Sequence, residues 1–265
     1  MNEQKARRSR VDNRLNVSCA AIGRRTFLRG VAVGTAMLAT PGLFAEELIR
    51  TPSMAEGPFY PDKLPLDTDN DLLIINDSLT PAVGEITHLS GQVLTKTGAP
   101  IRNAFVEIWQ VDNTSSYVHT RGRNPDGNDG NFQGYGRFLT SAKGEYYFRT
   151  IKPVPYGMSG IFRTPHIHFA ISKNGRRVFT TQMLIAGHPD NKRDGLFKRV
   201  RDPKLRETIL VDFKRLEGSE LGELTAKFDI VLGKTVQELD DGTLKGGIGK
   251  PEGRGFGSFR RRRRR

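Results

Sequence analysis

The sequence of 265 residues contains a single cysteine, Cys19, and it lies within the first 45 residues. One cysteine excludes a disulfide framework, and its position excludes a thiolate metal site in the rest of the chain. A long apolar run is also missing. The run Gly30–Ala39 is too short and too rich in Gly and Ala for the roughly 20 residues of a membrane span.

Net charge is largely absent from the middle of the chain, although the whole sequence carries a formal charge of +13. Residues 1–45 hold eight Lys/Arg against two Asp/Glu, and six more positive charges form the run Arg260–Arg265. The chain between these ends has a net charge of +1. The folded part therefore offers no obvious phosphate-binding face.

A targeting segment is predicted at residues 1–45. An Arg-rich stretch leads to Arg24-Arg25-Thr26-Phe27-Leu28-Arg29, which is followed by the apolar run and a short stretch ending at Ala45. This pattern resembles a twin-arginine export signal with cleavage near Ala45. We therefore expect export by the twin-arginine route to the periplasm or the exterior, in an already folded state.

Composition divides the remaining chain into three parts. Residues 46–85 are predicted to be an irregular lead-in with turn chemistry, and residues 86–232 a β-sandwich domain built from short runs rich in Val, Ile, Phe, Tyr and Thr. Residues 233–265 lose periodicity, become Gly-rich and end in the Arg run, which predicts a disordered tail.

The expected strands are Ile86–Leu94, Ala104–Val111, Glu145–Ile151, His166–Ser172, Val178–Ile185 and Phe228–Leu232. Strands at this spacing without helical patterns between them predict an all-β fold, an antiparallel β-sandwich with long irregular loops. One weak helical candidate is Leu205–Leu216.

His166-Ile167-His168 is the strongest local signal for chemistry. On a strand, residues i and i+2 point to the same face, so the two imidazoles stand side by side. Each buried imidazole needs a polar partner. The pair therefore indicates metal ligation, whereas a satisfied structural histidine remains the alternative and is favoured for His88 and His188.

The identity of such a metal depends on the other ligands. The absence of cysteine argues against structural thiolate zinc, and a His-x-His pair with a distant carboxylate would suit Fe(II) or Zn(II). Two tyrosines at turn-like positions, Tyr117 and Tyr156, are further candidates. A phenol with a pKa of about 10 must lose its proton to a strongly Lewis-acidic ion, which favours a ferric ion. Taken singly, each tyrosine is more often structural.

Seven segments, read in order, resemble the intradiol ring-cleavage dioxygenases, and the likeness runs from about Glu56 to Leu232. It is closest to the protocatechuate 3,4-dioxygenase group. The segments are Gly91-Gln92-Val93, Ala104–Gln110, Tyr117-Val118-His119, Gly134–Arg137, Gly144–Pro153, Arg163–Phe169 and Phe228–Leu232.

The resemblance implies one mononuclear non-haem Fe(III) ion held by Tyr117, Tyr156, His166 and His168. By motif, Tyr117 and His166 would be equatorial ligands, with Tyr156 and His168 axial. It also implies that a catechol dianion chelates the ion and displaces Tyr156, which takes up a substrate proton. Dioxygen would then cleave the ring between the two hydroxyl-bearing carbons.

Three more residues take roles from the resemblance. Arg163 matches the guanidinium that stabilises a developing carbanion, Gln182 matches an amide behind the ligands, and Trp109 matches an aromatic wall of the substrate pocket or is a core indole. Two departures leave the substrate open: Leu184 stands where the family commonly has an aromatic, and the segment Gly157–Phe162 is short.

Two other classes of function remain as alternatives. A non-catalytic β-sandwich binding module would require the Tyr and His set and Arg163 to coincide by accident. A polyanion binder driven by Arg260–Arg265 is disfavoured by the near-neutral middle of the chain. The expected partners are a small aromatic diol and dioxygen, without specific nucleic acid or a membrane span, and the oligomeric state is open.

Overall fold

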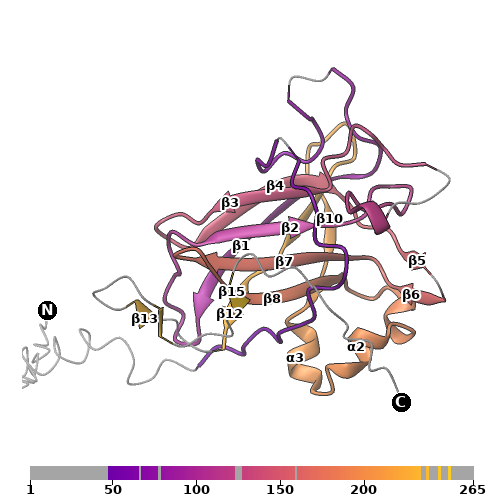
Figure 1. The fold of residues 1–265 in the computed structure, drawn as a ribbon. Coiled ribbons are helices and arrows are strands. Elements are labelled where there is room, and N and C mark those ends of the chain that lie inside the picture. Colours follow the sequence, from indigo (N-terminus) through magenta and orange to yellow (C-terminus); the bar gives the residue numbers. More distant parts are fainter. Residues whose placement is uncertain are drawn as a thin grey trace, which may run out of the picture. The chain divides into compact units, whose positions relative to one another are not determined.

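The structure is a computed structural model that describes residues 47–65, 67–76, 79–122, 127–158 and 160–233, and three two-residue strands between 237 and 251. These parts are mostly β, with few and short helices (Figure 1). No helix among the described residues is long and apolar enough to cross a membrane. The predicted export signal, Cys19 and the terminal Arg run lie outside the described residues.

The first sheet has β1 (Ile86–Thr95) at its centre. It pairs antiparallel with β4 (Glu145–Ile151) and parallel with β11 (Leu224–Lys227) and β12 (Ile230–Leu232), while β10 (Phe213–Arg215) extends the sheet from β11.

The second sheet carries the residues of interest for function. Its order is β15 (Lys250–Pro251), β8 (Arg176–Ile185), β7 (His166–Lys173), β2 (Phe105–Trp109) and β3 (Tyr135–Leu139), with β9 (Leu210–Val211) parallel to β8.

Smaller elements connect and flank these sheets. They are the hairpin β5 (Tyr156–Met158) and β6 (Ile161–Arg163), the strand pair β13 (Gln237–Glu238) and β14 (Leu244–Lys245), the 3-10 helices η1 (Thr120–Gly122) and η2 (Pro189–Lys192), and the short helices α2 (Gly195–Arg199) and α3 (Pro203–Glu207).

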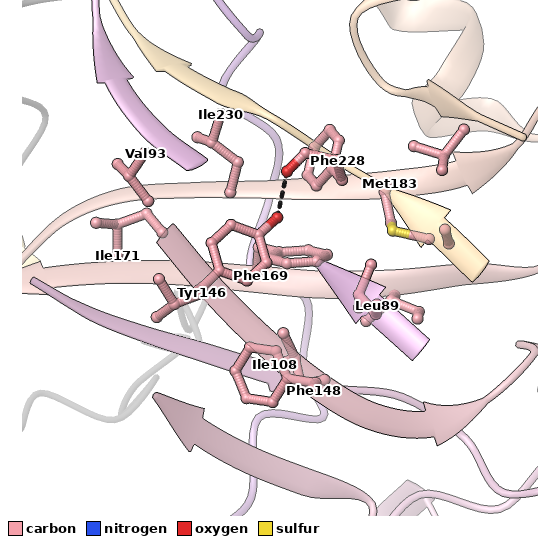
Figure 2. Packing of buried hydrophobic residues seen from close by; sticks show 14 of the residues in the cluster. Leu89, Val93, Ile108, Tyr146, Phe148, Phe169, Ile171, Met183, Phe228 and Ile230 are labelled. Atoms are coloured by element: carbon pink, nitrogen blue, oxygen red, sulfur yellow. Dashed lines mark hydrogen bonds between the residues drawn. The ribbon is translucent and has the colours of Figure 1, made fainter. Parts of the chain in front are cut away.

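The main core lies between the two sheets (Figure 2). Along β1, buried and half-buried residues alternate, as expected for a strand with one face on a core. Residues of β7 are instead buried at seven consecutive positions. Ile167 and Phe169 point into the main core, so the opposite face of β7, which carries His166 and His168, must be covered by something else.

The lead-in covers this outer face of the second sheet. The backbone of Met54 donates to the carbonyl of Thr180 at 3.0 Å, and the hydroxyl of Thr180, on the outer face, donates to the carbonyl of Met54 at 2.9 Å. The described residues of the lead-in form neither helix nor strand, apart from one isolated bridge at Asp71. The lead-in is irregular in backbone but is fixed to β8.

The predicted fold class is confirmed as a β-sandwich, and Glu145–Ile151 was predicted with its observed bounds. Most strand pairs are antiparallel, as predicted, but β1 pairs parallel with β11 and β12, and β8 with β9. Within the predicted tail, β15 pairs with β8.

The helical candidate Leu205–Leu216 was wrong beyond Glu207, because α3 ends there and two strands follow. Ile209 and Val211 are both buried, which is the alternation of a strand. Their carbonyls accept hydrogen bonds from Leu184 and Ala186, at the end of β8 and just beyond it, at 2.8 and 2.9 Å. Pairing with β8 outweighs the helical preference of this segment.

Gly91 provides a test of how closely the first sheet is packed. A Cβ at this position would overlap the carbonyl oxygen of Phe228 and lie 2.7 Å from the Tyr146 hydroxyl, which itself donates to that carbonyl (Figure 2). We expect Gly91→Ala to lower the free energy of unfolding by about 1–3 kcal/mol, because an overpacked core must shift backbone. Urea denaturation measures this. Gly130→Ala, with open space around its Cβ, is the control, and an equal effect of both would contradict the packing argument.

Candidate metal centre

The second sheet aligns three predicted site residues in one row. Trp109 on β2 pairs with His168 on β7, and His168 pairs with Gln182 on β8. His166, two residues earlier on β7, pairs with Leu184 on β8. Paired residues share a face of a sheet, so both imidazoles lie on the outer face, as the i, i+2 spacing predicts.

Tyr117 reaches the two histidines from the loop after β2. The Asp112 side chain accepts hydrogen bonds from the backbone of Thr114 and Ser116, which fixes the turn before Tyr117. The Tyr117 hydroxyl then lies 3.3 Å from Nε2 of His166 and 3.1 Å from Nε2 of His168. The two Nε2 atoms are 3.1 Å apart. Three side-chain donors therefore converge on one point.

These donors are neutral in the folded protein. Nδ1 of His166 lies 2.6 Å from the carbonyl oxygen of Thr164, so Nδ1 carries the proton and Nε2 presents its lone pair. Burial lowers the pKa of His166 to about 3 and the pKa of His168 well below its usual value. Burial raises the pKa of Tyr117 well above its usual value. The tyrosine thus stays a phenol until a cation compensates the phenolate charge.

Tyr156 lies beside this group on the β5–β6 hairpin. Its ring centroid is 5.3 Å from that of Tyr117 and 5.7 Å from that of His166. The hairpin places Tyr156 directly opposite Arg163 in register. Burial raises the pKa of Tyr156, and the positive charge of Arg163 opposes that rise. Sequence reasoning treated residues 157–162 as a short loop and missed this pairing.

The residues present fit a single metal ion. An ion about 2.0–2.1 Å from each donor holds neighbouring donors roughly 2.9–3.4 Å apart, and the three measured separations are 3.1–3.3 Å. Two phenols and two imidazoles form a hard, oxygen- and nitrogen-only donor set. Elsewhere in the described part of the chain, no group of three or more His, Cys, Asp or Glu side chains could hold a metal.

Arg163 is buried next to the donors and is held from two sides. Its Nε donates to Asp194 at 2.7 Å, and its terminal nitrogen donates to Oε1 of Gln182 at 2.6 Å. Gln182 in turn donates to the carbonyl of Ala55 in the lead-in at 2.8 Å. Arg163 and Gln182 were each predicted as site residues, and the structure brings them together in one fixed orientation.

Asp194 was missed by sequence reasoning. It is fully buried, caps the start of α2 through the backbone of Leu196 and Phe197, and accepts from Thr164 as well as from Arg163. An Asp before a short helix is a recognisable N-cap signal, but its ion pair with a residue 31 positions earlier leaves no local pattern.

Trp109 and Leu184 are both buried near the donors. Trp109 is 1% exposed and stacks on His168, so its predicted role as a pocket wall stays a prediction. Leu184 packs into a separate apolar cluster with Met54 and Ile209. Phe59, in the lead-in, was not singled out by sequence reasoning; its ring centroid lies 5.2 Å from that of Tyr117.

Comparison with known proteins identifies the family of the chain. The family described as Dioxygenase matches residues 55–234. The chain is 36% identical over 156 residues to the protocatechuate 3,4-dioxygenase beta chain of Burkholderia cepacia, covering 57% of this chain and 65% of that one.

Solved structures show the same fold. The dioxygenase domain of a dioxygenase carbohydrate-binding protein fusion from Streptomyces sp. SirexAA-E matches with a TM-score of 0.51 and 28% identity, over 70% of this chain and 99% of that one. Catechol 1,2-dioxygenase from Acinetobacter sp. ADP1 matches with a TM-score of 0.56 and 25% identity, over 85% of this chain and 83% of that one.

The chain belongs to the intradiol ring-cleavage dioxygenase family. It covers 65% of the length of the Burkholderia relative and 62% of the length of catechol 1,2-dioxygenase 2 of Acinetobacter lwoffii.

The ion pair of Arg163 gives a test that does not depend on a metal. We expect Asp194→Ala to lower the free energy of unfolding by about 3–5 kcal/mol, because it leaves a buried guanidinium without its counter-charge. Thermal and urea denaturation measure the loss. The control is Asp190→Ala, whose partner Arg193 is 70% exposed, and which we expect to cost no more than about 1 kcal/mol. Similar small losses in both variants would show that Asp194 does not compensate Arg163.

Proposed function

We propose that this chain is a non-haem Fe(III) dioxygenase that cleaves catechol-type rings between the two hydroxyl-bearing carbons. The observation that carries the proposal is the convergence of Tyr117, His166 and His168 within 3.1–3.3 Å of one another, with Tyr156 alongside. The relatives named above are dioxygenases of protocatechuate and catechol, both aromatic diols.

Ferric iron, when bound, would withdraw charge from a coordinated diol and make its ring reactive toward dioxygen. Tyr156 is the donor best placed to move, because it sits on a short two-stranded hairpin and not on the six-stranded sheet. Its oxygen would take up a hydroxyl proton of the diol as it leaves the donor set. A proton accepted there stays inside the buried site.

Arg163 would stabilise negative charge that develops on the ring. Its guanidinium is permanently charged and planar, and Asp194 and Gln182 prevent it from rotating. Preorganised charge of this kind costs no rearrangement when the transition state forms. Asp194 would therefore act on Arg163 and not on the substrate.

The lead-in would exclude water and contact an aromatic ring. Phe59 packs against Tyr117 at 5.2 Å and against Tyr156 at 6.1 Å between ring centroids. Phe59 and Trp109 would provide an apolar wall beside the donors. An aromatic diol matches that environment in shape and polarity.

Export by the twin-arginine route is part of the proposal and is supported by the sequence Arg24–Arg29. A route that carries folded proteins suits a chain whose donors meet only after folding.

The donor set predicts the metal content of histidine variants. We expect the ferric protein to be coloured by phenolate charge transfer, and His166→Ala and His168→Ala each to bind iron more than about tenfold more weakly. Metal analysis and visible absorption measure this. The control is His88→Ala, because His88 lies on the first sheet, where Nδ1 is 2.6 Å from the Tyr147 hydroxyl, and this variant should keep its iron. An iron-replete but colourless protein would contradict the proposal.

The charges near the site predict the substrate preference. Arg163 is paired with Asp194, and Arg177 with Glu56 and Glu107. Neither guanidinium is therefore free to bind a ring carboxylate through two parallel hydrogen bonds. We propose that neutral catechols are used at least comparably to protocatechuate.

We therefore expect kcat/KM for protocatechuate to exceed that for catechol by less than roughly a hundredfold, a difference of about 2.7 kcal/mol. Steady-state kinetics with both substrates at equal ionic strength measure the ratio. A larger advantage for protocatechuate would reveal a dedicated carboxylate site.

A further inference from the structure

The two histidines of the centre are held in different ways. His166 donates from Nδ1 to the carbonyl of Thr164 at 2.6 Å. Ligating histidines usually fix their ring by such a second hydrogen bond. Nδ1 of His168 is buried and has no hydrogen-bond partner among the described residues. The orientation of the His168 ring must therefore come from packing.

Trp109 supplies that packing. The indole and the His168 imidazole lie nearly parallel, with 8° between their planes and 4.8 Å between their centroids. The backbone of Gly57 approaches the same imidazole, since a Cβ at Gly57 would lie 3.3 Å from Cε1 of His168. Stacking lets the imidazole move within its own plane but prevents it from tilting. Nε2 therefore stays directed at the Tyr117 hydroxyl.

Trp109 is itself fixed by an unusual buried carboxylate. Glu107 lies two residues earlier on β2, on the same face, and is 3% exposed. Its Oε1 accepts from the hydroxyl of Tyr60 at 2.8 Å and from that of Tyr135 at 2.5 Å. Tyr60 meets Trp109 edge to face at 5.1 Å, and Tyr135 is the partner of Trp109 across β2 and β3.

The other carboxylate oxygen of Glu107 binds Arg177 at 3.1 Å. Arg177 also binds Glu56 at 2.8 Å and lies over the Tyr60 ring at 4.4 Å. Burial and the charge of Glu107 raise the pKa values of Tyr60 and Tyr135, so both hydroxyls remain donors. A buried ionic network often adds little stability compared with apolar packing, so we infer that this network serves to fix the geometry around Trp109.

We propose that Trp109 is a positioning residue for His168, and that the Glu107 network, formed by Glu107, Tyr60, Tyr135 and Arg177, holds the indole in place. Stacking on the Trp109 indole orients the His168 ring, just as the hydrogen bond from Nδ1 to Thr164 orients the His166 ring. This inference rests on the proposed function only in that His168 is a metal donor.

The test replaces the indole by a flat and by a non-flat apolar side chain. Trp109→Phe keeps an aromatic face, whereas Trp109→Leu removes it. With the ferric proteins, we expect Trp109→Leu to lose iron to EDTA at least about tenfold faster than wild type, with a shifted charge-transfer band. Trp109→Phe should stay within about threefold and keep the band, because a benzene ring can still stack.

The matched control is Phe148→Leu, which also truncates a fully buried aromatic side chain to leucine, but in the main core. It should lower the melting temperature without changing the rate of iron loss. Tyr60→Phe removes one hydroxyl from Glu107 and supplies a milder variant if Trp109→Leu does not fold. We expect it to speed iron loss several-fold.

Distinct outcomes separate the two proposals. If the wild-type protein binds ferric iron and is coloured, but Trp109→Leu or, in its place, Tyr60→Phe retains iron and band unchanged, the positioning role is wrong. Equal iron loss from Phe148→Leu would also overturn it, by showing that general destabilisation is enough. A wild-type protein without colour or iron would contradict the proposed function itself.

Discussion

Burial of β7 on both faces is the constraint on which the rest of the structure depends. One face of this strand contributes Ile167 and Phe169 to the main core, and the other carries His166 and His168. Two imidazoles cannot be buried without polar partners. The lead-in, the loop that ends at Tyr117 and the β5–β6 hairpin all cover this face, and each brings a polar group or an aromatic ring to it. Two of the four proposed donors, Tyr117 and Tyr156, thus belong to the cover.

Both arginines near the donors have carboxylate partners. Arg163 is compensated by Asp194, and Arg177 by Glu56 and Glu107. The donors themselves are neutral, because burial favours the uncharged imidazole and the protonated phenol. An ion bound there must displace the phenol protons. Its affinity therefore rises with pH, as for other sites whose ligands lose protons on binding.

Local periodicity and motifs were sufficient to predict the fold class and part of the donor set. The period of two placed His166 and His168 on one face, and the β-rich runs with their turns predicted the sandwich. Tyr117 and Tyr156 lie on a loop and a short hairpin, so their turn-like positions made them candidates and the resemblance of motifs assigned them as ligands. Asp194 and the covering role of the lead-in were missed, because their partners lie 31 to 129 residues away and leave no periodic signal. The segment after α3 was misread because pairing with β8 outweighs its helical preference.

The attachment of the lead-in to β8 has a consequence for biosynthesis. Residues 51–57 leave the ribosome before any strand of the second sheet, yet their hydrogen bonds reach Thr180 and Thr181, 126 and 129 residues later. Thr51 also contacts Val231, 180 residues further on. The lead-in can therefore be fixed in place only after the strand that binds it has been synthesised. Until β8 has been synthesised, the lead-in has no partner on that strand, so the face that carries His166 and His168 lacks this part of its cover.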